Sequence, residues 1–309
     1  METHKYHDRI INLGREAGAH IVLPEINDER ISKAGEQLSS MGFNLVNIED
    51  NKENVDIYLD YLNQLSFTDN WPAENLREYL NDPLHFAMVM VACDDADCVV
   101  AGAVTSSSEV IRSAIRIIGI RPASNHVSSI FLMISPDGTH AYTFGDCAVI
   151  PEPDSKQLAS IAAESAEFHQ FLTGEEPRVA FLSFSTKGSA SHYRVDKVQD
   201  AVKIFGNKYP QIIHDGEIQV DAAIIPEVNT IKIPNSPLNG EANVLIFPNL
   251  DAGNIAYKIT ERLGGYSAWG PLLQGLNKPI HDLSRGCSVD DIINVSAIAA
   301  LQRNIYANV

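Results

Sequence analysis

The chain has 309 residues, of which 45% are hydrophobic, and its formal net charge is −17. A chain of this length can bury one large core or, more naturally, two. The negative charge argues against nucleic acids and anionic membranes as partners, because both require a positive field on the protein. With no apolar run near roughly eighteen residues and no signal-peptide pattern at the start, we expect a soluble cytoplasmic protein and no contact with a membrane.

Strand-like and helix-like segments alternate along nearly the whole chain, which indicates an α/β architecture with parallel sheets. In the first part of the chain, the pattern predicts a strand, a helix, an apolar helical face, a strand and a helix, at residues 20–24, 29–41, 86–92, 98–101 and 109–118.

The second part of the chain continues this alternation. Strands are predicted at residues 128–134, 141–149, 179–184, 222–225 and 242–247. Helices are predicted at residues 157–171 and 196–205, and an Ala-rich helix is predicted after Asp291. No GxGxxG or P-loop spacing accompanies these elements, which lowers the odds of a dehydrogenase or a nucleoside triphosphatase.

Cysteine usage fits a reducing compartment. The four cysteines are Cys93, Cys98, Cys147 and Cys287, and we expect four free thiols and no zinc site. Cys287 has two interpretations. It could be a nucleophile, because a helix N-terminus and a nearby arginine lower the pKa of a thiol. It could equally be a small residue that packs beneath its loop.

The most informative segment lies near the C-terminus, at Leu283-Ser-Arg-Gly-Cys-Ser288. The eight residues from Ser284 to Asp291 combine the Ser284 hydroxyl, the Arg285 cation and the Asp291 carboxylate, just before the Ala-rich helix. A helix N-terminus offers free N–H groups and a positive dipole end to an anion. The arginine fork indicates that this anion is a phosphate or a carboxylate. The segment therefore predicts a site for a phosphorylated substrate.

The same motif resembles the signature of the phosphate acetyltransferase (phosphotransacetylase) family, and the likeness covers roughly residues 20 to 305. Further matching words follow one another at residues 21–25, 28–31, 144–149, 182–186, 215–217, 226–228, 243–248, 252–254 and 270–275. So many ordered matches are far more specific than one short motif. The resemblance implies reversible acyl transfer between acetyl phosphate and coenzyme A, which gives acetyl-CoA and phosphate.

The resemblance also implies a fold. It predicts two three-layer α/β/α domains like those of the isocitrate/isopropylmalate dehydrogenase-like fold, with the active site in the interdomain cleft. We assign residues 1–122 plus 272–309 to the first domain and residues 123–271 to the second. The resemblance further implies a homodimer that binds only small molecules: acyl phosphate, phosphate, and coenzyme A as a substrate. It implies neither a metal nor a permanently bound cofactor.

Two catalytic roles follow from the resemblance at the C-terminal motif. Arg285 is expected to clamp the phosphoryl group, and Ser284 is expected to donate a hydrogen bond to the oxyanion of the tetrahedral centre. The residues alone leave another interpretation open. Ser284 could make only local turn bonds, and Arg285 could pair with Asp282.

Asp291 has two interpretations as well. Ser288 and Asp291 have the spacing of a capping box, which on its own favours helix capping. By resemblance, Asp291 is the general base toward the thiol of coenzyme A. A thiol with a pKa of about 8.5 is mostly protonated at neutral pH, so removing its proton is a useful catalytic step. Both functions can coexist.

The remaining candidates bind substrate in this interpretation: Arg112, Ser129, Asn254 and Gln274. Arg112 follows a serine-rich loop at a helix start, and its alternative is a solvent-facing cation beside Glu109. Asn254 and Gln274 lie beside glycines, which permit close approach of a ligand. Their alternative is a structural bond to loop backbone.

One departure from the family pattern concerns residues 65–72, where a basic segment is usual and this chain has no cation. The departure leaves two alternatives to acetyl transfer. One is transfer of propionyl, butyryl or branched acyl groups, and the other is a non-catalytic metabolite-binding homologue. A decarboxylating dehydrogenase is weaker still, because the acidic residues do not group as metal ligands.

Overall fold

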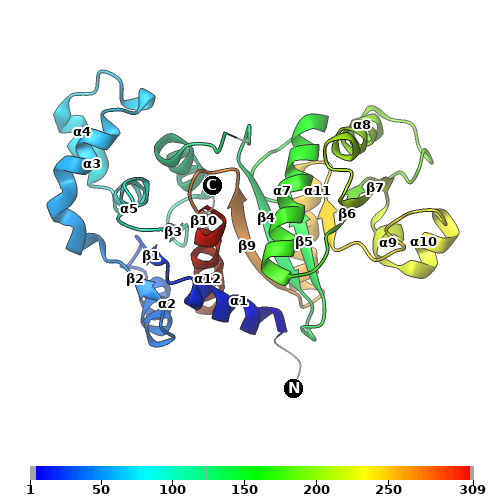
Figure 1. Ribbon diagram of the computed structural model, residues 1–309, viewed down its shortest axis with the longest axis horizontal. Coiled ribbons are helices and arrows are strands. Elements are labelled where there is room, and N and C mark those ends of the chain that lie inside the picture. Colours follow the sequence, from blue (N-terminus) through cyan, green and yellow to red (C-terminus); the bar gives the residue numbers. More distant parts are fainter. Residues whose placement is uncertain (1–4, 123, 307–309) are drawn as a thin grey trace. The chain divides into compact units, whose positions relative to one another are not determined.

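The computed structural model describes residues 5–122 and 124–306. The chain forms two compact units. Of the described residues, the first unit consists of residues 7–122, 124–125 and 270–306, and the second consists of residues 126–269 with residues 5–6. Both units have strands that alternate with helices (Figure 1), and each unit is described separately below.

The sheet of the first unit has the strand order β10-β3-β1-β2. Its strands are β1 (His20–Val22), β2 (Asn44–Leu45), β3 (Cys98–Ala101) and β10 (Ile280–Asp282). All three of these pairings are parallel. Every residue of β3 is buried, as expected for a central strand with helices on both faces. The first, third and fourth of these strands therefore end at one edge of the sheet.

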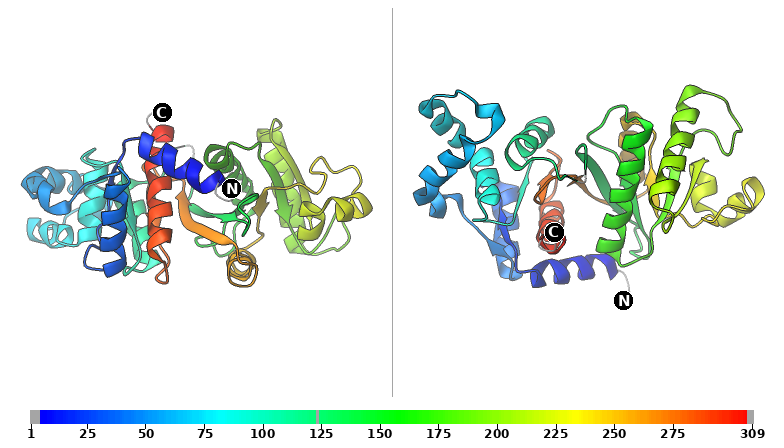
Figure 2. Two further views of the ribbon diagram at one scale, coloured as in Figure 1. Left: turned by 90° about the horizontal axis from the view of Figure 1, so that it is seen from below. Right: turned by 45° about the horizontal axis from the view of Figure 1, so that its top comes forward.

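Helices cover both faces of this sheet (Figure 2). α2 (Glu29–Ser40) and α12 (Val289–Tyr306) pack against each other, and α5 (Pro83–Ala92) packs on β3 from the other side. The other elements of this unit are α1 (Lys5–Glu16), η1 (Ile48–Asn54), α3 (Val55–Leu62), η2 (Ser66–Thr68), α4 (Ala73–Leu80), α6 (Ser107–Ser113) and η3 (Ala114–Ile118).

The sheet of the second unit has the order β7-β6-β8-β5-β4-β9 and is mixed rather than parallel throughout. Its strands are β4 (Ser128–Ile134), β5 (Ala141–Gly145), β6 (Arg178–Leu182), β7 (Ile213–Ile218), β8 (Val244–Ile246) and β9 (Ser267–Gln274). β4 and β5 pair antiparallel, whereas β5, β8, β6 and β7 pair parallel. The antiparallel pair follows from its short connection, because parallel strands need a long crossover.

Each face of this sheet carries its own hydrophobic core. Along β6, Val179 and Phe181 join the core beneath α7 (Ser155–Thr173) and α8 (Tyr193–Lys208). Ala180 and Leu182 alternate with them and join the core on the opposite face. The helices on that face are α9 (Val220–Ile224), α10 (Pro226–Lys232) and α11 (Leu250–Arg262). This period of two gives helix, sheet and helix layers, which agrees with the expected α/β/α class.

One predicted strand is wrong. Residues 222–225 belong largely to helix α9, in which the Ala223 N–H donates to the Gln219 carbonyl oxygen at 3.1 Å. A run of four apolar residues cannot be assigned to strand or helix by periodicity alone. Other boundaries differ less. β5 ends at Gly145 instead of residue 149, and the helix predicted at 109–118 divides into α6 and the π-helical η3.

Two further observations concern the described residues. All four cysteines are free thiols, as expected. Among the helices in the described part of the chain, none is both long enough and apolar enough to cross a membrane.

Candidate active site

The C-terminal motif forms an exposed loop between β10 and α12. The Cys287 N–H donates to the Ser284 carbonyl oxygen at 2.9 Å, and the Gly286 N–H donates to Ser284 Oγ at 3.3 Å. Ser284 and Arg285 are exposed, whereas Cys287 is buried. The turn therefore presents the hydroxyl and the guanidinium to solvent and places the thiol beneath them.

Cys287 has the features of a packing residue. Burial raises the pKa of its thiol, and the nearby Arg30 opposes this shift only in part. A reactive cysteine needs a lowered thiol pKa and access to solvent. The structure therefore favours the packing interpretation of Cys287 over the nucleophilic one.

Arg285 does not pair with Asp282. Within residues 5–122 and 124–306, no ion pair of the Arg285 side chain is found, and Asp282 is fully buried behind the loop. The backbone of Arg285 is held instead, because its carbonyl oxygen accepts a hydrogen bond from Arg30. An exposed guanidinium on a restrained backbone is suited to bind an anion.

Asp291 closes a capping box with Ser288. Asp291 Oδ2 accepts hydrogen bonds from the Ser288 N–H at 2.8 Å and from Ser288 Oγ at 2.9 Å. In return, the Asp291 N–H donates to Ser288 Oγ at 3.1 Å. The capping interpretation is therefore present in the structure. Both bonds of the carboxylate end on Oδ2, so capping leaves Oδ1 for another task.

Arg30, in the first turn of α2, ties this loop to its surroundings. Arg30 Nη1 donates to the carbonyl oxygens of Arg285 at 2.7 Å and Cys287 at 3.1 Å. Nη2 donates to the Ala103 carbonyl oxygen and to Asp28, each at 2.9 Å. The Asp28 side chain also caps α2, and Arg30 lowers the pKa of its carboxyl group to about 2. One guanidinium thus holds two loops together.

In the loop after β3, successive backbone amides converge on one of the chain's own carboxylates, that of Glu25. The Gly102 and Ala103 N–H groups donate to Glu25 Oε2 at 2.9 and 2.8 Å. The Val104 and Thr105 N–H groups donate to Glu25 Oε1 at 3.1 and 2.7 Å. Successive amides that converge in this way form an anion-binding nest.

Arg112 projects from α6, the helix that follows this loop. Its guanidinium pairs with Glu109 at 2.6 Å, where the Arg112 side chain is exposed and the Glu109 side chain is half-buried. This is the arrangement of the alternative interpretation, an exposed cation beside Glu109. A surface ion pair of this kind contributes only about 0–1 kcal/mol, so Glu109 does not hold Arg112 firmly.

Ser129 and Asn254 lie in the second unit and bond to the segment that follows β5. The buried Ser129 donates through Oγ and through its N–H to Asp146 Oδ1. Asp146 Oδ2 also accepts from the Ile150 N–H at 2.7 Å. Asn254 Nδ2 donates to the Cys147 carbonyl oxygen at 3.1 Å. Both side chains therefore support the backbone of residues 146–150.

Gln274 is buried at the end of β9, whose residues from Gly270 onward belong to the first unit with the C-terminal motif. Ser284 and Arg285 share the loop that precedes α12, and Asp291 lies in the first turn of that helix. Arg112 and Gln274 belong to the same unit. Glu25 and Arg30 were not predicted as functional residues. They lie in the segments 21–25 and 28–31, which match the family pattern. That match was the one signal in the sequence that could have identified them.

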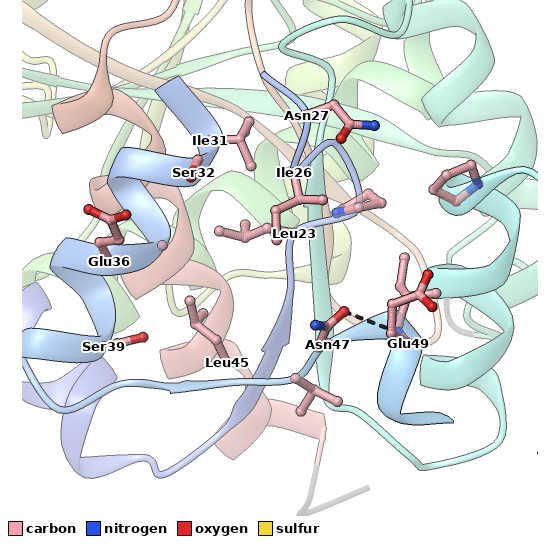
Figure 3. A pocket seen from close by; sticks show the side chains of 15 residues that line it. Leu23, Ile26, Asn27, Ile31, Ser32, Glu36, Ser39, Leu45, Asn47 and Glu49 are labelled. Carbon is pink, nitrogen blue, oxygen red and sulfur yellow. Dashed lines mark hydrogen bonds between the residues drawn. The ribbon is translucent and has the colours of Figure 1, made fainter. Parts of the chain in front are cut away.

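A separate pocket of about 700 Å³ lies in the first unit, beside the carboxyl ends of β1 and β2. Figure 3 shows Ser32, Glu36 and Ser39 of α2 on one side, with Asn47 and Glu49 on the other. Its lining contains no predicted site residue and no Lys or Arg of the described chain. Among the described residues there is also no group of His, Cys, Asp and Glu able to hold a metal ion.

Comparison with known proteins shows a consistent pattern. Residues 36–300 match the family model described as phosphate acetyl/butaryl transferase. The phosphate acetyltransferase of Acetivibrio thermocellus is 39% identical, and the match covers 96% of this chain and 97% of that protein.

Solved structures agree. The EutD phosphotransacetylase from Staphylococcus aureus is 39% identical with a TM-score of 0.85, and the match covers 96% of this chain and 99% of that one. A phosphotransacetylase from Streptococcus pyogenes is 34% identical with a TM-score of 0.87, and the match covers 96% and 98% of the two chains.

Asp282 gives the region a testable pH dependence. Burial raises the pKa of its carboxyl group to about 7, and Glu25 adds to this shift, while Ser107 and the Leu283 N–H oppose it. The folded protein therefore holds a proton on Asp282 that the unfolded chain releases above about pH 4. This contribution to stability is complete below about pH 4 and is lost as the pH rises through about 7. His281 acts in the opposite sense, because burial lowers its pKa to about 4.

We predict that Asp282→Asn removes the contribution of Asp282 and leaves that of His281. Relative to the variant, the parent should therefore gain on the order of 2–3 kcal/mol of unfolding free energy between about pH 8 and about pH 5. Denaturant unfolding of both proteins at the two pH values measures the difference. Parallel pH dependences would show that Asp282 is ionised in the folded protein.

Proposed function

The chain belongs to the phosphate acetyl/butaryl transferase family, and we propose that it transfers an acetyl group reversibly between acetyl phosphate and coenzyme A. The products are acetyl-CoA and inorganic phosphate. The observation that carries this proposal is the loop of residues 283–288 in a chain with this membership. It exposes Ser284 and Arg285 immediately before the helix that Asp291 caps.

Arg285 is the proposed clamp of the phosphoryl group. Its guanidinium is exposed, and its carbonyl oxygen accepts a hydrogen bond from Arg30 Nη1 at 2.7 Å. This bond restrains the backbone from which the side chain extends. Guanidinium and phosphate form paired, charge-assisted hydrogen bonds. The cation is also local compensation for an acidic protein, since charges beyond about 8–10 Å are screened at physiological salt.

Ser284 is the proposed donor to the oxygen that becomes negative during transfer. Its Oγ accepts the Gly286 N–H at 3.3 Å, and the hydroxyl hydrogen remains free to donate. A donor of this type stabilises the tetrahedral centre more than the planar carbonyl group.

Asp291 is the proposed general base. Its Oδ1 takes the thiol proton of coenzyme A while Oδ2 keeps the bonds from Ser288. The sulfur then forms a bond to the carbonyl carbon of acetyl phosphate, the bond between that carbon and the bridging oxygen breaks, and phosphate leaves with the electron pair. Asp291 later returns its proton to solvent or to phosphate. Capping orients the carboxylate, so the two interpretations of Asp291 are compatible.

The other sequence predictions enter as part of this proposal. Arg112 binds substrate after releasing Glu109, and Gln274, Asn254 and Ser129 complete or support the substrate site. Coenzyme A is a substrate, and no resident cofactor takes part. We further propose a cytoplasmic homodimer, and domains at residues 1–122 with 272–309 and at 123–271.

The identity of the acyl group is the first point to test. We predict that purified protein forms a thioester from acetyl phosphate and coenzyme A. Propionyl and butyryl phosphate should react with a lower kcat/KM, because each methylene changes discrimination by about 1–3 kcal/mol. Thioester absorbance with each acyl phosphate measures this. Preference for a longer or branched acyl group would reassign the substrate, and no thioester with any of them would indicate a non-catalytic homologue.

The base role of Asp291 has a matched control in its neighbour Asp290, which lies in the same first turn. We predict that Asp291→Asn lowers kcat by about 10²–10⁴, the usual contribution of positioned proton transfer. Asp290→Asn should leave kcat nearly unchanged, because Asp290 has no part in the proposed proton transfer. Its loss of helix-dipole stabilisation, about 0.3–1 kcal/mol, should match that of Asp291→Asn.

Steady-state kinetics and thermal melting on the same preparations separate the two functions of Asp291. A lowered melting temperature with parental turnover in Asp291→Asn would make Asp291 a cap only. The reaction would then need a different base.

A further inference from the structure

Loops from three neighbouring strands meet at one edge of the first unit's sheet. β10, β3 and β1 are adjacent and parallel, so the segments after Asp282, Ala101 and Val22 leave the sheet at the same edge. The first of these segments carries Ser284 and Arg285, and the second leads into α6 with Arg112. The third carries Glu25, whose side chain has no role in the proposed chemistry.

Glu25 organises the segment after β3. It accepts hydrogen bonds from the four successive N–H groups of residues 102–105, at distances from 2.7 to 3.1 Å. Without a carboxylate these converging dipoles would repel one another, so the backbone shape depends on the negative charge. Hydrogen bonds to a charged acceptor are also stronger than neutral ones.

Gly102 brings this segment against the one that carries Arg285. Its φ is +113°, and a Cβ at this position would lie 2.7 Å from the Leu283 N and closer still to Asp282 Oδ1. The Leu283 N–H also donates to the Ala101 carbonyl oxygen at 2.7 Å. The two segments are therefore in direct backbone contact, and only glycine permits it.

Arg30 makes a second connection between the same segments. Nη2 donates to the Ala103 carbonyl oxygen at 2.9 Å, and Nη1 donates to the Arg285 carbonyl oxygen at 2.7 Å. Ala103 also donates its N–H to Glu25. A shift of the 102–105 segment would therefore move the guanidinium that holds the backbone of Arg285.

We propose that Glu25 is a positioning residue for acyl transfer. It touches no reacting atom, and it acts through the 102–105 amides and Arg30 on the placement of Arg285. The inference rests on the proposed function of Arg285 as the phosphoryl clamp. Its energetic basis is that small displacements of a positioned group cost large factors in rate, about 10²-fold for roughly 1 Å.

Glu25→Gln tests this proposal because it keeps the size of the side chain and replaces one oxygen with an amino group. That amino group would face two N–H donors that now share one carboxylate oxygen. The matched control is Glu29→Gln, a nearby carboxylate whose side chain pairs with the exposed Lys33. We expect kcat/KM for acetyl phosphate to fall about 10–100-fold in Glu25→Gln, with KM for coenzyme A within about twofold of the parent. The control should keep parental constants.

The kinetic constants separate positioning from a purely structural role. A structural carboxylate would lower the melting temperature but leave the constants of the folded enzyme unchanged. Folded Glu25→Gln with kcat/KM within about twofold of the parent would overturn the proposal, as would an equal loss in Glu29→Gln. If Glu25→Gln does not fold, Glu25→Asp takes its place, because it keeps the charge and shortens the reach. The same thresholds then apply.

Calorimetric titration with inorganic phosphate keeps this test independent of turnover. We expect the Kd for phosphate to rise about tenfold or more in Glu25→Gln and to stay parental in Glu29→Gln. If the parent makes no thioester, the proposed function fails, and the phosphate titration alone decides the role of Glu25. Equal phosphate affinity in parent and Glu25→Gln would overturn the positioning role even in an active enzyme.

Discussion

The candidate site depends on one guanidinium that holds backbone rather than ligand. Arg30 joins the carbonyl oxygens of Ala103, Arg285 and Cys287, and Asp28 fixes its orientation from the start of the same helix. A loop of polar residues and a glycine has many conformations of similar energy, and each residue fixed costs roughly 1–2 kcal/mol of backbone entropy. Charge-assisted bonds at both ends of the guanidinium offset that cost. The exposed Arg285 therefore starts from a restrained backbone.

Acidic residues shape the first unit in three different ways. Glu25 fills an amide nest, Asp291 caps α12, and Asp282 is buried with a raised pKa. The carboxylates of Glu25 and Asp291 accept hydrogen bonds from backbone N–H groups, which favour the charged form. Asp282 is buried, and burial favours its neutral, protonated form. Although the chain as a whole is strongly negative, these three carboxylates are engaged with the backbone or neutralised.

Sequence reasoning predicted the fold class, the exact bounds of β3, and the capping box of Ser288 and Asp291. These rest on local signals, namely apolar period, motif spacing and capping-box spacing. The secondary-structure prediction was wrong at residues 222–225, most of which belong to helix α9. A short apolar run does not distinguish a strand from a helix. Sequence reasoning did not assign the bonds of Glu25 and Arg30, because these bonds join residues 77 and 255 positions apart. Such contacts depend on strand order, which no local pattern specifies.

The most direct test of the account is the dependence of acetyl transfer on the Arg285 side chain. The measurement is kcat/KM for acetyl phosphate in the parent, in Arg285→Lys and in Arg285→Ala, with folding checked by thermal melting. The account predicts a loss of about 2–5 kcal/mol in transition-state stabilisation for Arg285→Ala and a smaller loss for Arg285→Lys, which keeps the charge but not the fork. Constants within about twofold of the parent in folded Arg285→Ala would contradict it, and the phosphoryl group would have to bind elsewhere.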